Sequence, residues 1–380
     1  MNELESQLHY PFGDAVPAAG KTIEVAPGVR WLRMALPFAL DHINLWLLRD
    51  AVDGDDGTAV EGWTIVDCGI ANDATRAAWE QIFANELGGL PVLRVVVTHM
   101  HPDHVGLAHW LTERHNVRLW MSATDFNAAR QASASTTGFG GEATARFVAS
   151  HGLTDPDSQE KIKARRNYYA SMVPQVPASF RRMMDGDRLT IRGREWTCHA
   201  GYGHAPEHIA LHCPSDGAPK TPAASAPHGD APGFGAARRP GGTLISGDMV
   251  LPRISTNVSV HDVEPESNPL QLYLDSLRRM QALPEDTLVL PSHGRPFTGL
   301  HTRIEQLIAH HDARFGEVIH ACAEAPQCAA DLLPVLFKRP LDLHQTTFAI
   351  GESIAHLHAL WFAGRLRRER AGNIWRFSLP

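Results

Sequence analysis

A short apolar segment that is followed at once by a group of histidines limits the fold of this 380-residue chain more than any other feature. Residues 91–98 hold four valines and a leucine, which predicts a strand covered on both faces. A strand over 62–66 and a helix over about 73–87 are expected before it. The order strand, helix, strand indicates an α/β arrangement, in which ligands gather at the carboxyl ends of the strands.

The histidine group lies directly after this strand, where residues 98–106 read Thr-His-Met-His-Pro-Asp-His-Val-Gly. His99 and His101 project to the same side of an extended chain, and the following turn brings Asp103 and His104 to an adjacent position. Imidazole and carboxylate groups are common metal ligands, so the motif predicts a metal site. Gly106, which has no side chain, allows a neighbouring backbone to approach closely.

Three further motifs fall at the ends of predicted strands: Gly203-His204 followed by His208, Ser246-Gly247-Asp248, and Ser292-His293-Gly294. Each motif alone is typical of a turn. Their common position at carboxyl ends of strands lets them meet the first motif in one place.

Composition excludes several classes of protein. The formal net charge of −7 argues against a protein that mainly coats nucleic acid or anionic membranes. The five cysteines contain no C-x-x-C pair, which predicts a reducing compartment and inert thiols. No signal-peptide pattern and no apolar run approaching the length of a membrane span is present, so we expect a cytoplasmic protein that does not contact the membrane.

The motifs resemble those of the metallo-β-lactamase superfamily of hydrolases and occur in the same order. They are Asp67 in Val66-Asp67-Cys68-Gly69, the H-x-H-x-D-H block, His204, Asp248 and His293. The resemblance covers residues 28 to about 299 and implies an α+β fold, the four-layer αββα sandwich. A helical insertion, read from the residues themselves, and a small, mostly helical C-terminal domain, which resembles an appendage of some members, are expected as additions to that sandwich.

The resemblance implies a site for two divalent metal ions. The first ion is expected on His99, His101 and His204, and the second on Asp103, His104 and His293, with Asp248 bridging the two. Asp67 is expected to orient ligands. The set contains no cysteine and is similar to the glyoxalase II-like set. Imidazole favours zinc, and the carboxylates also admit manganese or iron.

The expected chemistry follows from charge. The positive charge of two divalent ions exceeds the negative charge of Asp103, Asp248 and a bridging hydroxide, so the pKa of bound water falls and an oxyanion is stabilised. Metal-bound hydroxide is then the nucleophile, with Asp103 and His204 as catalytic residues. Tyr202 either donates a proton to the leaving group or packs as scaffold.

The third motif departs from the pattern Thr-Pro-Gly-His-Thr-Pro-Gly-His of many relatives and reads Gly-Tyr-Gly-His-Ala-Pro-Glu-His over residues 201–208. Tyr202 and Glu207 are the departures. Glu207 either supports a ligand or lies in a solvated turn, and His208 is expected to be structural.

Residues outside the motifs are candidates for substrate contact. His42 either touches substrate or is a satisfied turn histidine. Tyr168 and Tyr169, with Arg165 and Arg166 nearby, either contact an acidic or acyl substrate or form a solvated basic helix face.

The chain is expected to divide into a catalytic domain, 1–300, and a winged-helix-like C-terminal domain, 301–380. Within the first, 125–185 is predicted as a helical insertion over the site and 214–242 as a flexible loop between strands. In the second, Thr302 and Glu305 form a capping-box signature. The helix that they begin is expected to place His310 and His311 at the surface.

Three functions are compatible with these motifs. The favoured function is a dinuclear hydrolase that cleaves an ester, thioester or lactone of a small metabolite. The second is a nuclease or RNA-processing enzyme, because residues 364–380 contain five arginines and one glutamate. A packing or homodimer module is the alternative for that tail. The third is a mononuclear iron oxidoreductase similar to the persulfide dioxygenases.

Overall fold

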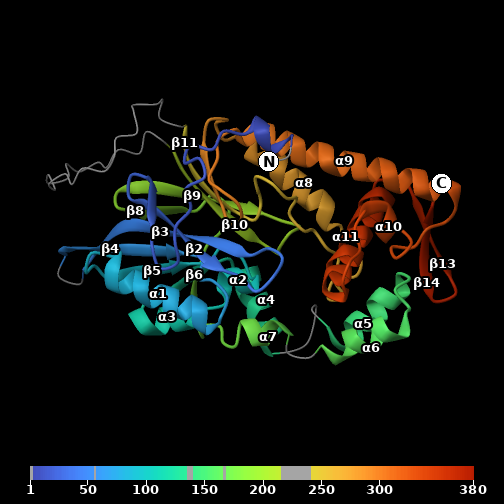
Figure 1. The fold of residues 1–380 in the computed structure, drawn as a ribbon, viewed down its shortest axis with the longest axis horizontal. Helices are drawn as coiled ribbons and strands as arrows, with labels where there is room; N and C mark the ends of the chain where they lie inside the picture. The colour runs from blue at the N-terminus through green and yellow to red at the C-terminus, as the bar shows by residue number, and fades with distance from the viewer. Residues whose placement is uncertain (1–2, 55–56, 135–139, 166–167, 215–240) are drawn as a thin grey trace.

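The computed structural model describes residues 3–54, 57–134, 140–165, 168–214 and 241–380 (Figure 1). Most of the loop expected over 214–242 therefore lies outside the described residues, and so does Arg166. After a short 3-10 turn (Glu5–Gln7), the elements form two large sheets, flanking helices and a C-terminal hairpin.

The first sheet contains the histidine-bearing strand that the sequence predicts. Its strands, in spatial order, are β1 (Ile23–Ala26), β2 (Val29–Ala35), β3 (His42–Asp53), β4 (Ala59–Val66), β5 (Val92–Val96), β6 (Leu119–Met121) and β7 (Phe180–Arg182). Strands β1 to β4 are antiparallel neighbours, whereas β4 to β7 run parallel. Parallel neighbours require crossovers. Helix α1 (Asp73–Asn85) connects β4 to β5, α2 (Pro102–Val105) and α3 (Ala108–His115) connect β5 to β6, and the helices of the insertion connect β6 to β7.

The second sheet carries the other motifs. Its strands are β8 (Arg188–Ile191), β9 (Arg194–Gly201), β10 (His208–Pro214), β11 (Gly242–Gly247) and β12 (Leu288–Pro291), in spatial order β12-β11-β10-β9-β8. Only the β11–β12 pair is parallel among these described neighbours, and α8 (Pro269–Met280) connects its two strands.

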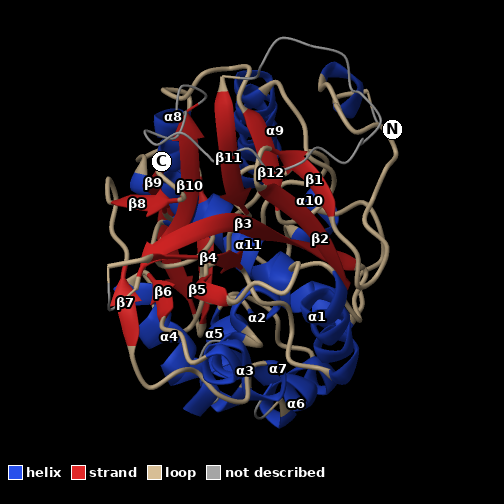
Figure 2. Ribbon diagram, turned by 90° about the vertical axis from the view of Figure 1, so that its left-hand side faces the viewer, coloured by secondary structure: helices blue, strands red, loops and turns tan. Residues whose placement is uncertain are grey.

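The two sheets pack face to face between helical layers, which confirms the expected sandwich (Figure 2). The middle of β3, residues 45–48, is apolar because both of its faces are covered. Leu45 and Leu47 face the helices α1 and α3, whereas Trp46 and Leu48 face the second sheet. Helix α8 and the C-terminal helices cover the outer face of the second sheet.

The insertion is helical, as expected, and its helices pack into two different hydrophobic cores. It contains α4 (Ala123–Ala134), α5 (Gly141–Ser150), α6 (Pro156–Ala164) and α7 (Tyr168–Met172). Helices α4 and α7 pack on the first sheet through Phe126 and Tyr169. Helices α5 and α6 instead join the core of the second sheet through Val148 and Ile162 (Figure 1).

The C-terminal region consists of α9 (Leu300–Glu324), α10 (Leu333–Leu336), α11 (Leu343–Phe362) and a hairpin of β13 (Arg367–Ala371) and β14 (Ile374–Ser378). Its helices share one buried cluster with the second sheet: Ile304 and Ile354 lie in the same core as Leu244. Among the described helices, none is long and apolar enough to cross a bilayer.

Two expectations for this region are wrong. Helix α9 begins at Leu300, after Gly299 at φ 103°, so Thr302 lies inside the helix instead of capping it. The capping box of this region is instead formed by Asp342 and Gln345 at the start of α11. His311 is buried, because α11 covers that face of α9, and its Nδ1 lies 3.2 Å from Nε2 of His356.

Gly106 follows the H-x-H-x-D-H motif and lies against residues 69–71, which come after β4. A Cβ there would stand 2.5 Å from the carbonyl oxygen of Pro102 and 2.7 Å from backbone atoms of Gly69 and Ala71. Backbone atoms have little room to move, so we predict that Gly106→Ala lowers the free energy of unfolding by about 1–3 kcal/mol. Chemical denaturation measures this change.

Gly316 provides the matched control, since it lies on the exposed face of α9, where an added Cβ would meet no atom within 4 Å. Gly316→Ala should stabilise the protein by about 0.5–1 kcal/mol through helix propensity. Equal effects of the two substitutions would show that the approach at Gly106 is not tight.

Candidate metal centre

The predicted ligands come from separate motifs and meet at one end of the sandwich. His99 and His101 follow β5, and Asp103 and His104 begin the short helix α2. The remaining three residues, His204, Asp248 and His293, follow β9, β11 and β12. Their side chains form two groups with atoms within 4.8 Å of one another, His99, His101, His204 and Asp248 in one and Asp103, His104 and His293 in the other.

The first group is a triangle of imidazole nitrogens. Nε2 of His99 lies 2.9 Å from Nδ1 of His101, which lies 3.0 Å from Nε2 of His204. The two Nε2 atoms of His99 and His204 are 3.2 Å apart. Ligands about 2.1 Å from one ion stand about 2.9–3.4 Å apart at octahedral to tetrahedral angles, so the triangle has the dimensions of three ligands to one ion.

Asp248 stands between the two groups. Its Oδ2 lies 3.3 Å from Nε2 of His204, whereas its Oδ1 lies 3.4 Å from Nε2 of His104 and 3.5 Å from Nε2 of His293. Asp103 completes the second group, with Oδ2 3.4 Å from Nε2 of His293. Each oxygen of Asp248 therefore faces a different group.

Two atoms of this centre lack the hydrogen bonds that burial normally demands. Oδ1 of Asp248 and Nε2 of His104 are buried without a hydrogen-bond partner. A buried polar atom without a partner costs about 1–3 kcal/mol, so such atoms indicate a missing ligand. A divalent cation between the side chains satisfies both atoms, and the donor set therefore fits metal binding.

Hydrogen bonds on the far side of the rings fix the orientation of three histidines. His204 donates from Nδ1 to the carbonyl of Asn257 (2.7 Å), and His293 donates from Nδ1 to the carbonyl of His42 (2.7 Å). Nδ1 of His104 lies 2.8 Å from Oδ2 of Asp67. Each of these contacts leaves Nε2 with its lone pair toward the centre.

Asp67 is held in a conformation that non-glycine residues rarely adopt, at φ 64°. Its buried carboxylate accepts hydrogen bonds from the backbone N–H of Thr98 (2.8 Å) and from the Thr98 hydroxyl (3.0 and 3.1 Å). Asp67 thus joins the end of β4 to the residue before His99.

Local charges differ between the two groups. Burial, followed by the neighbouring histidines, lowers the pKa of His99 and His101 well below the usual value, so both rings are neutral and can bind metal. Burial also opposes protonation of His104, but Asp67, Asp103 and Asp248 outweigh it and raise its pKa well above the usual value. A cation beside His104 relieves the same excess of negative charge.

Asp125 is a supporting residue that the sequence motifs did not reveal. Its buried carboxylate accepts hydrogen bonds from the backbone N–H of Met100 (2.8 Å) and of Glu207 (2.6 Å), and so joins the loops that carry His101 and His204. Ser122 and Asp125 have capping-box spacing, which predicts the start of α4 but not this contact.

The structure favours one of the two alternatives for Tyr202 and for His42, and it excludes substrate contact for Tyr169. Tyr169 is only 2% exposed and donates its hydroxyl to the carbonyl of Met100, so it supports the metal loop and is too buried to touch substrate. Tyr202 packs at the edge of the core between the sheets, with Arg279 over its ring, which are the contacts of scaffold. His42 uses both ring nitrogens, on Asp41 and on the N–H of Gly294, and is a satisfied turn histidine.

Of the remaining candidates, His208 and Glu207 form hydrogen bonds close to the centre, whereas Tyr168 and Arg165 line a separate cavity. His208 is structural, as expected: it is buried, and its Nε2 accepts a hydrogen bond from the N–H of Asp248 (3.2 Å). The Glu207 carboxylate accepts a hydrogen bond from the Thr124 hydroxyl (2.9 Å). Tyr168 and Arg165 line a cavity between α5, α6 and α11.

We predict that Asp125→Asn weakens metal binding about 10–100-fold, the usual loss when a partner of a ligand-bearing element is removed. The amide places an N–H₂ group against a backbone N–H, so at least one of the two hydrogen bonds is lost. Titration with a metal-competing chelator measures the affinity. Asp157→Asn, at an exposed ion pair on α6, is the control and should leave the affinity unchanged.

Comparisons with known proteins agree with this geometry. The family model for the metallo-β-lactamase superfamily matches residues 44–218, and the model for the metallo-β-lactamase-like C-terminal domain matches residues 315–380. The crystal structure of a β-lactamase domain protein from Burkholderia ambifaria is 52% identical, with a TM-score of 0.86 and 100% of both chains covered.

Two more distant relatives span nearly the whole chain. The metallo-β-lactamase family protein TTHA1429 from Thermus thermophilus is 26% identical, with a TM-score of 0.68, over 94% of this chain and 100% of that one. The "Probable metallo-hydrolase YqjP" of Bacillus subtilis (strain 168) is 25% identical over 338 residues, 87% of this chain and 91% of the relative. The chain therefore belongs to the metallo-β-lactamase superfamily and is a metal-dependent hydrolase.

Proposed function

We propose that this hydrolase uses two divalent metal ions to cleave an ester, thioester or lactone of a small metabolite. The observation that carries the proposal is the position of Asp248, whose two carboxylate oxygens face two different groups of ligands. A carboxylate in this position bridges two ions, and its otherwise unpartnered Oδ1 has no other evident use.

Each ion is assigned its own residues. His99, His101 and His204 hold the first ion, and Asp103, His104 and His293 hold the second, with Asp248 on both. When bound, a pair of divalent ions supplies an activated water as nucleophile and polarises the carbonyl that is attacked. No serine or cysteine nucleophile is then needed, and the described cysteines are all buried thiols.

The residues of the chain contribute orientation. Hydrogen bonds from His204 to Asn257 and from His293 to His42 hold the ligand rings before any ion arrives. Such preorganisation reduces the rearrangement that metal binding and catalysis would otherwise require. Asp103, the most exposed carboxylate of the centre at 18% for its side chain, borders the side from which substrate must approach.

Zinc is the proposed metal. Five of the seven candidate ligands are imidazoles, which zinc binds well, and the first group has the size of a zinc site. Two carboxylates also suit manganese or iron, so metal analysis decides between them. A mononuclear iron oxidoreductase is less well supported, because a single ion leaves one of the two assembled groups without a function.

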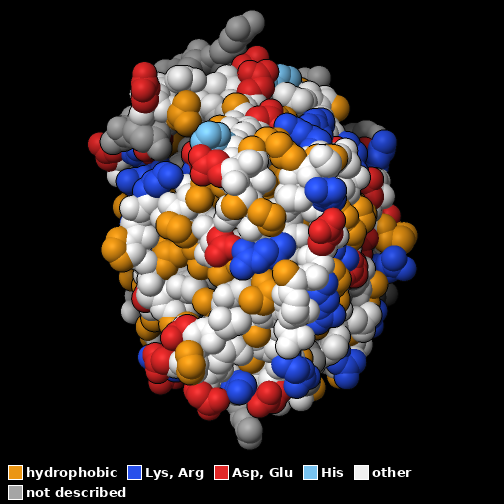
Figure 3. Space-filling model, turned by 90° about the vertical axis from the view of Figure 1, so that its right-hand side faces the viewer, with side chains coloured by type: hydrophobic (Ala, Val, Ile, Leu, Met, Phe, Trp, Pro, Cys, Tyr) orange, Lys and Arg blue, Asp and Glu red, His pale blue; other side chains and the backbone are white. Residues whose placement is uncertain are grey.

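The surface of the C-terminal region favours a small substrate over RNA. Arg368 pairs with Glu266 and Arg376 with Asp331, so these two tail arginines are already engaged within the chain. The face at this end of the molecule intersperses acidic and basic side chains among hydrophobic ones (Figure 3). Nucleic-acid recognition normally uses a continuous basic stripe.

We predict that Asp103→Ala and His204→Ala each lower kcat/KM for ester, thioester and lactone substrates by at least about 100-fold and reduce the bound metal. A panel of acyl-CoA, acyl-glutathione, lactone and RNA substrates, with metal content by mass spectrometry, provides the measurement. Each variant removes a ligand from a different group, so the two variants should lose metal from different sites.

Asp275→Ala and His320→Ala, both at exposed positions on helices, are the matched controls and should retain activity and metal. Unchanged turnover in Asp103→Ala or His204→Ala would contradict the proposal. Turnover of RNA alone would move the assignment to a nuclease.

A further inference from the structure

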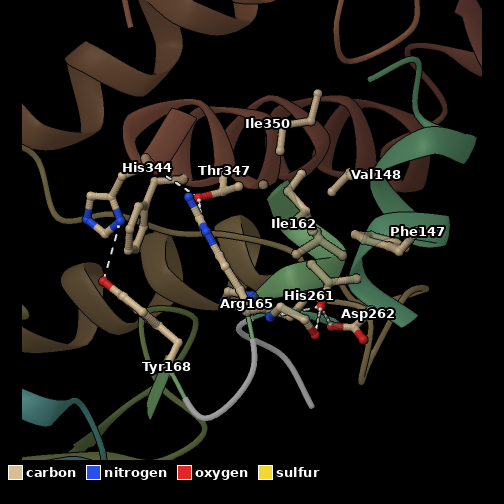
Figure 4. Close-up of a pocket in the computed structure, with 15 residues that line it drawn as sticks. Phe147, Val148, Ile162, Arg165, Tyr168, His261, Asp262, His344, Thr347 and Ile350 are labelled. Atoms are coloured by element: carbon tan, nitrogen blue, oxygen red, sulfur yellow. Dashed lines mark hydrogen bonds between the residues drawn. The ribbon is translucent and has the colours of Figure 1, made fainter. Parts of the chain in front are cut away.

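A cavity lies at the place where the insertion meets the C-terminal helices (Figure 4). Helices α5 and α6 form one wall and α11 forms another. The third wall is formed by residues 260–262, at the end of the segment 256–262, which comes after β11 in the chain. Nothing in the metal chemistry uses this cavity, and the residues that line it come from parts of the chain without metal ligands.

The segment 256–262 connects the cavity directly to the metal centre. At its beginning, Thr256 donates its hydroxyl to the carbonyl of Asp248, and Asn257 accepts the hydrogen bond from His204. Three residues later, Val260 bonds to the carbonyl of Gly351 and lines the cavity. Three residues of chain span at most about 11 Å, so the cavity begins within the length of a small metabolite from the ligands.

One part of the cavity is apolar. Val148, Ile162 and Ile350 converge there from α5, α6 and α11, with Phe147 beside them (Figure 4). Val148, Ile162 and Ile350 belong to one buried core, which fixes the shape of this wall. An aliphatic chain placed against the wall gains about 25 cal/mol for each Å² of apolar surface removed from water.

The other part of the cavity is cationic and aromatic. The Arg165 guanidinium donates to the hydroxyl of Thr347 (3.0 Å). The Tyr168 hydroxyl lies 3.4 Å from Nδ1 of His344. Asp262, the carboxylate in the lining, accepts a hydrogen bond from Thr144 (3.2 Å). Within the described part of the chain, Arg165 forms no ion pair and its side chain has no hydrogen-bond partner besides Thr347, so its other donors are available to a ligand or water.

From this arrangement we infer that the cavity is a substrate subsite for a medium-length aliphatic acyl chain that carries an anionic group, with Arg165 pairing with the anion. The apolar wall binds the chain, and Arg165 distinguishes acidic substrates from neutral ones of the same length. The inference rests on the proposed function, since it names the class of ester or thioester whose acyl part extends away from the metals.

The first test measures binding and needs no turnover. Butane-, hexane- and octanesulfonate, together with octanol, are titrated into the metal-loaded full-length protein by calorimetry. The sulfonates supply an anion that binds metals weakly. We expect the affinity of the sulfonates to rise with chain length. Arg165→Gln should weaken octanesulfonate binding about tenfold or more, because one charge-assisted hydrogen bond is lost, and should leave octanol binding unchanged.

Arg146→Gln is the matched control, because Arg146 lies exposed on α5 in a loose ion pair with Glu142. Arg165→Lys keeps the charge and should retain more affinity than Arg165→Gln. Val148→Trp fills the apolar part and should weaken octanesulfonate and octanol alike. The chain-length series in the unmodified protein tests the same wall if this variant does not fold.

The second test measures selectivity in turnover. The monophenyl ester of octanedioic acid, which is acidic, is compared with phenyl octanoate, which is neutral. Arg165→Gln should lower the ratio of kcat/KM for the acidic ester to kcat/KM for the neutral ester about tenfold, by raising KM for the acidic ester. Equal effects of Arg165→Gln and Arg146→Gln, or affinity independent of chain length, would overturn the subsite. If the sulfonates behave as expected but neither these esters nor any acyl-CoA, acyl-glutathione or lactone substrate is cleaved, the subsite stands and the proposed function fails.

Discussion

Buried carboxylates at the strand ends are the constraint on which the rest of this structure depends. Asp67 joins β4 to Thr98 and His104, and Asp125 joins the metal loop after β5 to the loop before β10. A buried carboxylate is tolerated only when hydrogen bonds or cations satisfy it, so these residues force the loops of the two sheets into one arrangement. In that arrangement Oδ1 of Asp248 is buried without a hydrogen-bond partner, and a cation bound there would satisfy it.

The proposed metal centre and the proposed substrate subsite are built from different parts of the chain. The candidate ligands stand on loops of the two sheets, which pack through a continuous apolar core. The cavity beside them is instead built by α5, α6 and α11, which belong to the core of the second sheet and the C-terminal helices. The segment 256–262 contacts both regions. Substrate preference can therefore change through the helices without disturbing the ligand geometry.

Local patterns predicted the strand over 91–98 and a group of histidines at its end, because both are short-range signals. The sandwich and the division of the ligands into two groups came from the resemblance to the family. The structure contains β5 at the expected place and brings the candidate ligand side chains together in two groups. The role of Asp125 depends on contacts with Glu207, 82 residues away, which no local pattern contains. Thr302 and Glu305 have the spacing of a capping box, but α9 already begins at Leu300, with Gly299 in the N-cap position. His311 and Tyr169 were misjudged because packing by other helices decides their burial.

The central claim is that Asp248 bridges two ions. Anomalous diffraction from crystals of the metal-loaded protein tests it most directly, with data collected on both sides of the zinc absorption edge. The account predicts two anomalous peaks about 3.5–4 Å apart, one beside His99, His101 and His204 and the other beside Asp103, His104 and His293, with Asp248 between them. A single peak at full metal loading, or two peaks that Asp248 does not join, would contradict it.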